Sequence, residues 1–332
     1  MHRYILTQIA KYPNATWAKV FAKAMLFTPD PKDKDLVALS RTETIIIDQS
    51  QEPVTFTQQF IDTEKLFSES LHNFLILASD VNYLLYPTNN ICYYPYHFIS
   101  SRELACQDTD IISDNTIRKY KISCINGQGR YHRIENYIKL TKKLYFNQML
   151  VRMHNNYLGP DRLVFIGNTS DIDKNILDEF NLIKENLPTN HHCTFEIYDE
   201  SFCNSYINFI TETTVSNTVT FISEKTFKAF RSGQLPIWLG SPNTVKYIRD
   251  LGFDVFDDII NHSYDQEPNW HTRIDIIHQE IDRLINLDLD LVWKETINRR
   301  LKNRQWLLSE ELLHKATAHI DEHIFKRSNT SP

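Results

Sequence analysis

Glycine is scarce and unevenly placed in this sequence of 332 residues. All seven glycines fall after residue 126, so the first third of the chain has none. Loops that wrap phosphate groups generally use glycine, because a residue without a side chain lets the backbone approach the ligand closely. We therefore expect any nucleotide to bind in the second part of the chain.

Two further absences exclude whole classes of protein. The five cysteines are scattered and form no C-x-x-C pair, which indicates reduced thiols rather than a disulfide framework or a zinc site. No apolar run reaches the roughly 18 residues that a membrane span needs, and the first residues lack the apolar region of a signal peptide. We expect a cytoplasmic protein without a membrane span.

The usual motifs of nucleotide-binding proteins and hydrolases are missing too. The sequence has no G-x-x-x-x-G-K-[ST] phosphate loop, no G-x-G-x-x-G, no G-x-S-x-G and no H-E-x-x-H. The net charge of −6 and the pI near 6.1 argue against broad nucleic-acid binding, because displacement of counterions needs a basic surface. This disfavours nucleic acid as a partner and leaves a local basic patch open.

The length and the pattern of apolar residues predict an α/β protein with two lobes. A single core stops growing at roughly 250 to 300 residues, and apolar runs that alternate with amphipathic stretches are typical of parallel sheets with crossover helices. In a first lobe, residues 1–117, we predict strands Tyr4–Ile9, Leu36–Leu39, Thr44–Ile47 and Phe74–Ala78, helices Thr16–Leu26 and Thr57–His72, and a loop over Tyr83–Phe98.

The second lobe, residues 118–270, continues the alternation. There we predict strands Tyr120–Ile125, Met149–Met153, Leu163–Ile166, Thr194–Ile197 and Leu235–Leu239, an apolar stretch Tyr206–Thr211, and helices Tyr131–Phe146 and Ile172–Asn186. Residues 271–325 show a purely helical pattern, which continues through Trp306–Ile324, and we expect these helices to pack across the lobes. The last residues, 326–332, form a polar tail that we expect to fray.

One segment combines a helix start with charged residues. Ser223 is a good N-cap, Gly233 a good helix end, and Glu224 and Lys225 fall in the first turn between them. Backbone N–H groups and the helix dipole favour an anion there, so Lys225 could hold a diphosphate, Glu224 a ribose diol, and Phe221 could lie against a base. The alternative is that Glu224 only complements the dipole and that Lys225 is solvated.

The whole run from Phe221 to Gly240 resembles the donor-binding core of family 10 fucosyltransferases and related GT-B glycosyltransferases. The matching positions are Phe221, Glu224, Lys225, Gly233, Pro236 and Gly240. Phe221 stands where that family usually has tyrosine. The resemblance implies two Rossmann-like lobes that face a cleft, with C-terminal helices, and a nucleotide-sugar donor of which GDP-fucose is favoured.

Upstream residues extend the resemblance. Asn126 and Arg133 resemble the asparagine and the donor-binding arginine of the family, and Arg130 is a nearby substitute for that arginine. Glu212 resembles the glutamate of a Glu-Asn pair in the family, but Thr213 stands in place of the asparagine. Arginine suits a diphosphate because its planar fork donates two parallel hydrogen bonds. The alternative is that Arg130 and Arg133 are surface charges at a helix start.

The resemblance also implies an inverting reaction that needs no cofactor and no divalent metal, in which a carboxylate deprotonates a hydroxyl acceptor such as a glycan. Asp80 follows the Phe74–Ala78 strand, and catalytic groups tend to lie at strand ends, so we predict Asp80 as the base. Capping of a turn is its alternative role. His97, Asp108 and Asp110 are the other candidates for the base.

Two other functions stay open. The first is a non-catalytic module that keeps the GT-B-like fold and only binds a partner, which the poorly matched first lobe and the replaced asparagine favour. The second is a phage-type glycosyltransferase that modifies DNA, which the acidic pI disfavours.

Overall fold

The chain folds into two compact units, which a computed structural model describes over residues 25–27, 45–49, 65, 68–69, 74–81, 90–106, 117–126, 129–153, 173–183 and 200–330. The first unit joins Met1–Tyr96 to Leu313–Pro332, and the second is His97–Leu312. We expected lobes that meet at 117/118 and a separate helical segment from 271. The division into compact units falls at 96/97 and 312/313 along the chain, and the expected lobe boundaries stay predictions.

The first unit contains a parallel sheet of four strands. Its order is β1 (Met25–Phe27), β2 (Ile45–Gln49), β3 (Phe74–Ala78) and β4 (Ile91–Tyr93), in register pairs such as Ile47 with Ile76. Every residue of β3 is buried, as expected for an inner strand of a sheet covered on both faces. The prediction of β3 is confirmed at both ends, and β2 begins one residue after its predicted start.

Two predictions for this part of the chain were wrong. Met25–Phe27 is a strand, where we had extended a helix to Leu26. The expected loop Tyr83–Phe98 contains β4 and the start of α5 (Tyr96–Ala105). The three residues of β4 pair with β3, so a tertiary contact defines them rather than a local pattern. Pro95 directly precedes the helix, a position that proline tolerates because the first helical N–H groups have no partner in the helix.

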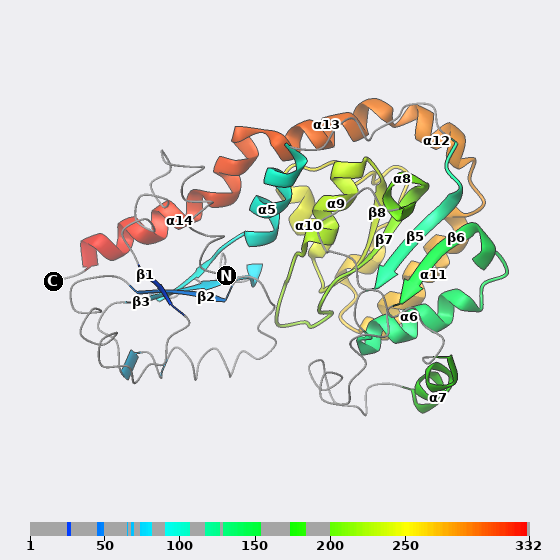
Figure 1. Cartoon of the computed structure of the whole chain (residues 1–332), viewed down its shortest axis with the longest axis horizontal. Coiled ribbons are helices and arrows are strands. Elements are labelled where there is room, and N and C mark those ends of the chain that lie inside the picture. The colour runs from blue at the N-terminus through cyan, green and yellow to red at the C-terminus, as the bar shows by residue number, and fades with distance from the viewer. Residues whose placement is uncertain are drawn as a thin grey trace. The chain divides into compact units, whose positions relative to one another are not determined.

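The second unit is built on another parallel sheet of four strands (Figure 1). Its strands are β5 (Tyr120–Asn126), β6 (Met149–Met153), β7 (Ser205–Thr211) and β8 (Leu235–Leu239), in the order β6-β5-β7-β8. The helices of this part of the chain are α6 (Tyr131–Thr141), α7 (Lys174–Ile183), α8 (Glu200–Cys203), α9 (Glu224–Ser232), α10 (Thr244–Asp250), α11 (Trp270–Leu284), α12 (Leu289–Glu295) and α13 (Ile297–Leu308).

The order of the strands reverses between β5 and β7. The chain leaves β5 through α6 towards β6 on one side, and leaves β7 through α9 towards β8 on the other. Right-handed crossovers in opposite directions put their helices on opposite faces of the sheet. Such a reversal opens a crevice at the carboxyl ends of the two central strands, where ligands of α/β proteins bind. Those ends are Asn126 and Thr211.

The helical predictions for the second unit were correct in type over the described residues and less accurate at their ends. Helix α6 stops at Thr141 rather than Phe146, because β6 must begin at Met149 to pair with Ile122 of β5. Ser309 separates α13 from α14 (Glu310–Thr330), within the Trp306–Ile324 stretch for which we predicted a helical pattern. Helix α14 runs to Thr330, so the expected frayed tail from residue 326 was wrong over most of its length. The predicted strands Tyr4–Ile9, Leu36–Leu39, Leu163–Ile166 and Thr194–Ile197 lie outside the described residues.

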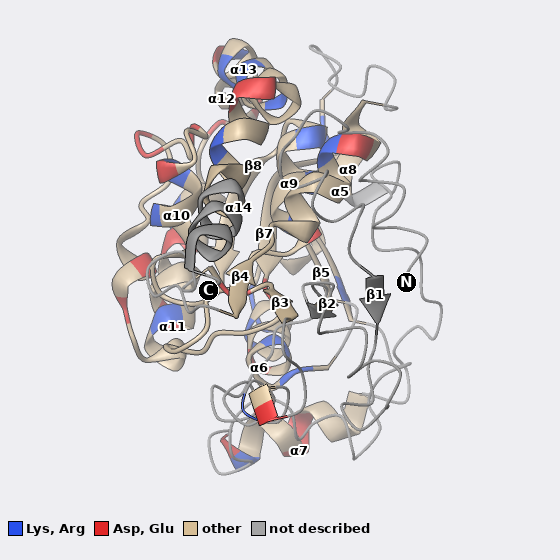
Figure 2. Ribbon diagram, turned by 90° about the vertical axis from the view of Figure 1, so that its left-hand side faces the viewer, with Lys and Arg blue, Asp and Glu red and all other residues tan. Residues whose placement is uncertain are grey.

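Basic and acidic residues are interspersed along the helices of the second unit, as in α10 and α11 (Figure 2). Within α11 this places Arg273 and Arg283 on the same helix as Asp275 and Asp282. Of the helices that the structure describes, none is long and apolar enough to cross a membrane.

Candidate functional site

The carboxyl ends of β5 and β7 are joined by a side-chain hydrogen bond. The hydroxyl of Thr211 donates to Oδ1 of Asn126, and Nδ2 of Asn126 lies 3.4 Å from the backbone oxygen of Arg152. Asn126 is 0% and Thr211 1% exposed. Asn126 therefore holds three strands of the sheet together at the point where the strand order reverses.

Glu212, the first residue after β7, turns its carboxylate towards the start of α9. Its Oε1 accepts hydrogen bonds from the backbone N of Ser223 (3.1 Å) and from Oγ1 of Thr226 (2.9 Å). Its Oε2 is buried and accepts no hydrogen bond from any residue that the structure describes. Burial raises the pKa of the Glu212 carboxyl, against the opposing effect of Lys225. A fully buried acceptor without a partner is an unusual feature, and a ligand donor would satisfy it.

Gly240 leaves room for this carboxylate at the end of β8. A Cβ atom at position 240 would lie 2.8 Å from Oγ1 of Thr244 and 3.4 Å from Cγ of Glu212. The glycine therefore permits a close approach of the strand end to the Glu212 side chain.

Helix α9 starts and ends as the sequence predicts. The Ser223 hydroxyl caps it by accepting from the backbone N of Lys225 (3.3 Å), and Gly233 ends it in the left-handed conformation with φ of 68°. In the first turn, Nζ of Lys225 donates to Oε1 of Glu224 (2.8 Å), and Nδ1 of His97 lies 3.4 Å from Oε2 of the same carboxylate.

Glu224 is ionised in this setting although it is only 5% exposed. Burial alone would raise its pKa, but Lys225, His97 and Lys228 outweigh burial and lower the pKa of Glu224 to about 2. One oxygen of this carboxylate therefore faces the Lys225 ammonium and the other the His97 imidazole. Three cationic or basic side chains surround one negative charge at a helix N-terminus, which gives this corner an excess of positive potential.

The predicted arginines lie at the start of α6 and donate to backbone oxygens at the end of β7 and in the two residues that follow it. Arg130 donates to the carbonyl of Thr213 (2.9 Å), and Arg133 to those of Thr211 and Glu212 (3.0 Å each). Arg133 is only 2% exposed. In this structure the two arginines fix the segment that carries Glu212, which we did not predict.

His132 completes the contacts between α6 and this segment. Its Nε2 lies 2.9 Å from the carbonyl oxygen of Glu212, which can only accept, so Nε2 carries the proton. Burial, reinforced by Arg133, lowers the pKa of His132 well below its usual value, so the ring is neutral. Its Nδ1 is then a second buried acceptor with no hydrogen-bond donor among the described residues.

Phe221 is buried rather than presented to a ligand. Its ring is 2% exposed and meets His97 edge to face, with 5.2 Å between the ring centroids. The expected contact with a base would require this ring to be uncovered.

The structure gathers most of the predicted site residues in the second unit. Those that surround the ends of β5 and β7 and the start of α9 are Asn126, Arg130, Arg133, Glu212, Phe221, Glu224 and Lys225. Asp80 belongs to the first unit, two residues after β3, and is 8% exposed. Asp108 and Asp110 lie outside the described residues.

Sequence reasoning missed three contributors. They are His132, Thr226, and Arg273 of α11, whose guanidinium donates to the backbone oxygen of Gly240. His132 lies between the two predicted arginines, and Thr226 follows the Glu-Lys pair directly, so proximity to the motif was the available signal for both. Arg273 is distant in sequence and had no such signal.

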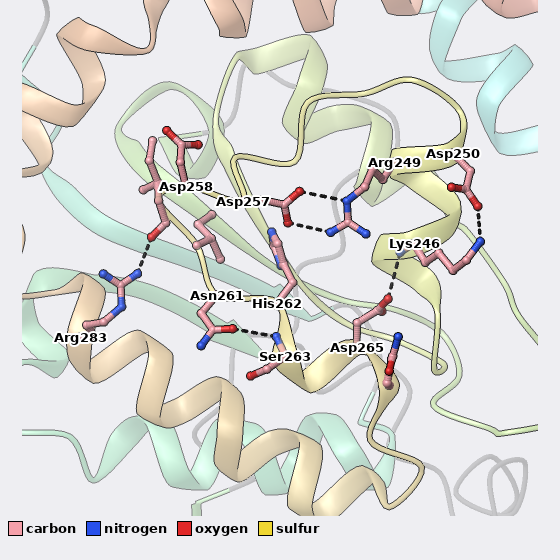
Figure 3. A pocket seen from close by; sticks show the side chains of 13 residues that line it. Lys246, Arg249, Asp250, Asp257, Asp258, Asn261, His262, Ser263, Asp265 and Arg283 are labelled. Atoms are coloured by element: carbon pink, nitrogen blue, oxygen red, sulfur yellow. Dashed lines mark hydrogen bonds and ion pairs between the residues drawn. The ribbon is translucent and has the colours of Figure 1, made fainter.

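An open cavity lies elsewhere in the second unit (Figure 3). It has a volume of about 920 Å³ and is lined by α10, by the segment 257–266 and by Arg283. Charged side chains that line the cavity already form ion pairs with each other: Arg249 with Asp257 (2.7 Å) and Lys246 with Asp250 (2.5 Å). Asp265 accepts from the backbone N of Val245 (2.8 Å). None of the predicted site residues lines this cavity, and its internal pairing favours a structural role.

No protein-family model, no curated protein and no solved structure matches this chain. The described residues hold no group of three or more histidine, cysteine or acidic side chains that could bind a metal ion.

Proposed function

We propose that the second unit binds the diphosphate of a nucleotide sugar at the start of α9 and that the chain is a glycosyltransferase of the GT-B kind. One observation carries the proposal. The Glu224–Lys225 pair and the unsatisfied Glu212 carboxylate lie together where β5 and β7 part, which is the usual ligand position in a parallel sheet.

The chemistry of this corner suits a ligand that carries both negative charge and hydroxyl groups. The N-terminus of α9, Lys225 and His97 favour phosphate oxygens, while the second oxygen of Glu212 offers an acceptor for a hydroxyl or amino group. A nucleotide sugar carries both kinds of group, whereas inorganic phosphate carries no sugar hydroxyl. In this proposal Arg130 and Arg133 fix the 211–213 segment, and Lys225 meets the phosphates.

The remaining parts of the proposal concern the reaction. A GDP-fucose-like donor and an inverting transfer to a hydroxyl acceptor, such as a glycan, follow from the resemblance of the Phe221–Gly240 segment. Asp80 in the first unit is the proposed base, and no cofactor is required. The four cysteines that the structure describes form no disulfide, which is compatible with a reducing cytoplasm.

A second candidate function is a binding module without catalysis. The oxygens of Glu224 face Lys225 and His97 of the chain itself, and Phe221 is buried, so the free protein presents neither a carboxylate for ribose nor an aromatic face for a base. Release of sugar from a nucleotide-sugar donor separates the candidates, since a module would bind the nucleotide and release no sugar.

Thermal unfolding in the presence of UDP, GDP, ADP, CMP and dTDP tests the proposal. A ligand at one hundred times its Kd stabilises the folded state by about 2.7 kcal/mol, which raises the melting temperature by several degrees. We expect one nucleoside diphosphate to do so and CMP, a monophosphate, to do so less. No shift with any of the five would contradict the proposal.

A further inference from the structure

Glu212 holds one carboxyl oxygen that no residue in the described part of the chain satisfies. Its Oε1 accepts from the backbone N of Ser223 (3.1 Å) and from Oγ1 of Thr226 (2.9 Å). Oε2 is bonded to the same carbon atom, so it also lies beside the first turn of α9, where it has no hydrogen-bond partner among the described residues. Glu212 is 0% exposed, and a polar atom buried in this state costs free energy until a partner reaches it.

The neighbours of Oε1 determine which of the two oxygens can carry a proton. Nε1 of Trp238 is a donor only and donates to Oγ1 of Thr226 (2.9 Å), so the Thr226 hydroxyl gives its own proton to Oε1. The N–H group of Ser223 is a second donor to Oε1. A proton on the carboxyl group would therefore sit on Oε2. It follows that Oε2 is a bare acceptor when Glu212 is ionised and an O–H group when Glu212 is neutral.

A hydroxyl is the ligand group that fits Oε2 in both states. It can donate to a carboxylate oxygen and accept from a carboxylic O–H, whereas an ionised phosphate oxygen only accepts and an amino group on an aromatic base only donates. Burial raises the pKa of Glu212 and the charge of Lys225 opposes that rise, so Lys225, which we assign to the diphosphate, lies near this carboxyl group. A group held at Oε2 is therefore close to the phosphates, where a nucleotide sugar carries its sugar hydroxyls.

Glu224 lies at the same helix start, but its oxygens are engaged within the chain. Its Oε1 accepts from Nζ of Lys225 (2.8 Å), and its Oε2 lies 3.4 Å from Nδ1 of His97. From the sequence we expected Glu224 to hold a ribose diol. Of these two carboxyl groups, Glu212 is the one that has an oxygen without a partner among the described residues.

We infer that Oε2 of Glu212, and not Glu224, binds a sugar hydroxyl next to the diphosphate, an inference that rests on the proposed function. The hydroxyl belongs to the ribose or to the transferred sugar, because both adjoin the diphosphate. Since Glu212 is fully buried, the packing beside the first turn of α9 opens to admit the hydroxyl and then encloses it. The free energy that the unsatisfied oxygen costs the free protein is regained in the complex. The site thereby selects nucleotides that carry this hydroxyl.

The test is calorimetric affinity of the full chain for UDP, GDP, ADP and dTDP, for their dideoxy counterparts, which lack the ribose hydroxyls, and for UDP-glucose, GDP-fucose, ADP-glucose and dTDP-glucose. Two ratios of Kd are compared, that of dideoxy to parent nucleotide and that of parent nucleotide to nucleotide sugar. We expect at least one ratio to be about tenfold in the unaltered protein. The first ratio identifies the ribose as the source of the hydroxyl, and the second identifies the transferred sugar.

Variants of the two carboxyl groups assign the contact. Glu212→Met removes both oxygens at similar length, so the ratio should fall to about one. Glu212→Gln keeps an oxygen towards the Ser223 N–H and places its NH2 group at the Oε2 position, where it donates to the hydroxyl, so the ratio should stay above one. Glu224→Gln should leave the ratio unchanged. Glu311→Gln, an exposed change in α14, is the matched control and should alter neither Kd nor the ratio.

The outcomes separate the inference from the function on which it rests. Both ratios near one in the unaltered protein overturn the inference and leave nucleotide binding in place, with Oε2 satisfied by a buried water molecule. A ratio that survives in Glu212→Met overturns it as well. So does a ratio that disappears in Glu224→Gln, and this arm needs no folded Glu212→Met. If the unaltered protein binds none of the four nucleoside diphosphates, the proposed function fails and the inference fails with it.

Discussion

Thr211 donates its side-chain hydroxyl to Oδ1 of Asn126 and so ties the last residue of β7 to the last residue of β5. The two strands are neighbours in the sheet, and beyond these residues their chains leave towards opposite sides. The bond therefore fixes the corner from which Glu212 reaches α9 and from which α6 begins. It positions the candidate site without being part of its exposed surface, since both side chains are buried.

Replacement of Thr211 by valine removes this hydrogen bond and keeps the shape of the side chain. We expect the free energy of unfolding to fall by about 1–3 kcal/mol, because Oδ1 of Asn126 is left buried without its donor. The change is measurable as a shift of the urea midpoint at constant slope. Thr272→Val on the exposed face of α11 is the control and should stay within about 0.5 kcal/mol of the unaltered protein. An unchanged midpoint for Thr211→Val would show that the bond contributes nothing.

Glu212 makes the stability of the protein depend on pH in a definite direction. Burial raises its pKa above the ordinary value of 4.5, so the folded chain holds a proton that the unfolded chain has already released. Stability from this group is therefore complete below pH 4.5 and falls as the pH rises through the folded pKa. Glu212→Gln stays neutral at every pH and should lose this dependence.

This pH dependence is measured by comparing the urea midpoints of Glu212→Gln and the unaltered protein between pH 5 and pH 8. We expect Glu212→Gln to gain stability relative to the unaltered protein as the pH rises, and Glu311→Gln, an exposed change in α14, to show no such trend. A Glu212→Gln variant that instead loses relative stability towards pH 8 would mean that the carboxylate is favoured in its ionised form in the fold.

Gly240→Ala should destabilise the protein through a specific contact. The new Cβ atom would lie 2.8 Å from Oγ1 of Thr244, which is itself held by the backbone oxygen of Ser241 (2.8 Å). Overpacking of this kind costs about 1–3 kcal/mol. Thr244→Ala removes the clashing oxygen. The double variant Gly240→Ala/Thr244→Ala should therefore lose less stability than the sum of the losses of the two single variants, and the difference should be about 0.5 kcal/mol or more. Additive losses in a double-mutant cycle would exclude this contact as the cause.

The sequence predicted the fold best where local pattern and tertiary pairing agree. Strands Phe74–Ala78 and Leu235–Leu239 are fully buried apolar runs, Met149–Met153 is a partly buried edge strand, and all three were predicted with their observed ends. The three-residue strands β1 and β4 were missed, because a strand of that length shows no period of its own and is defined by its neighbours β2 and β3. The early end of α6 has a similar cause, since the register of β6 limits the helix.

In the candidate site, too, the sequence predicted what local rules determine and missed what tertiary contacts determine. Ser223, Glu224, Lys225 and Gly233 follow local rules of helix capping, and the structure places their cap and end as predicted. No local rule could show that Arg133 would donate to carbonyls of β7 or that His97 would meet Glu224, because these contacts join residues far apart in sequence. The polar partners of a buried group depend on tertiary structure, which a motif does not contain.

Calorimetric titration of Lys225→Ala with nucleoside diphosphates tests the central claim most directly. Lys225 is partly exposed and its ammonium pairs with its neighbour Glu224, whose other oxygen lies near His97, so its removal should leave the fold of the free protein intact. We predict that Kd for the preferred nucleoside diphosphate rises by about tenfold or more, since a charge-assisted hydrogen bond to phosphate is lost. Lys142→Ala, which removes an exposed lysine paired with Glu179, should leave Kd unchanged. Unaltered affinity of Lys225→Ala for UDP, GDP, ADP and dTDP would contradict the account.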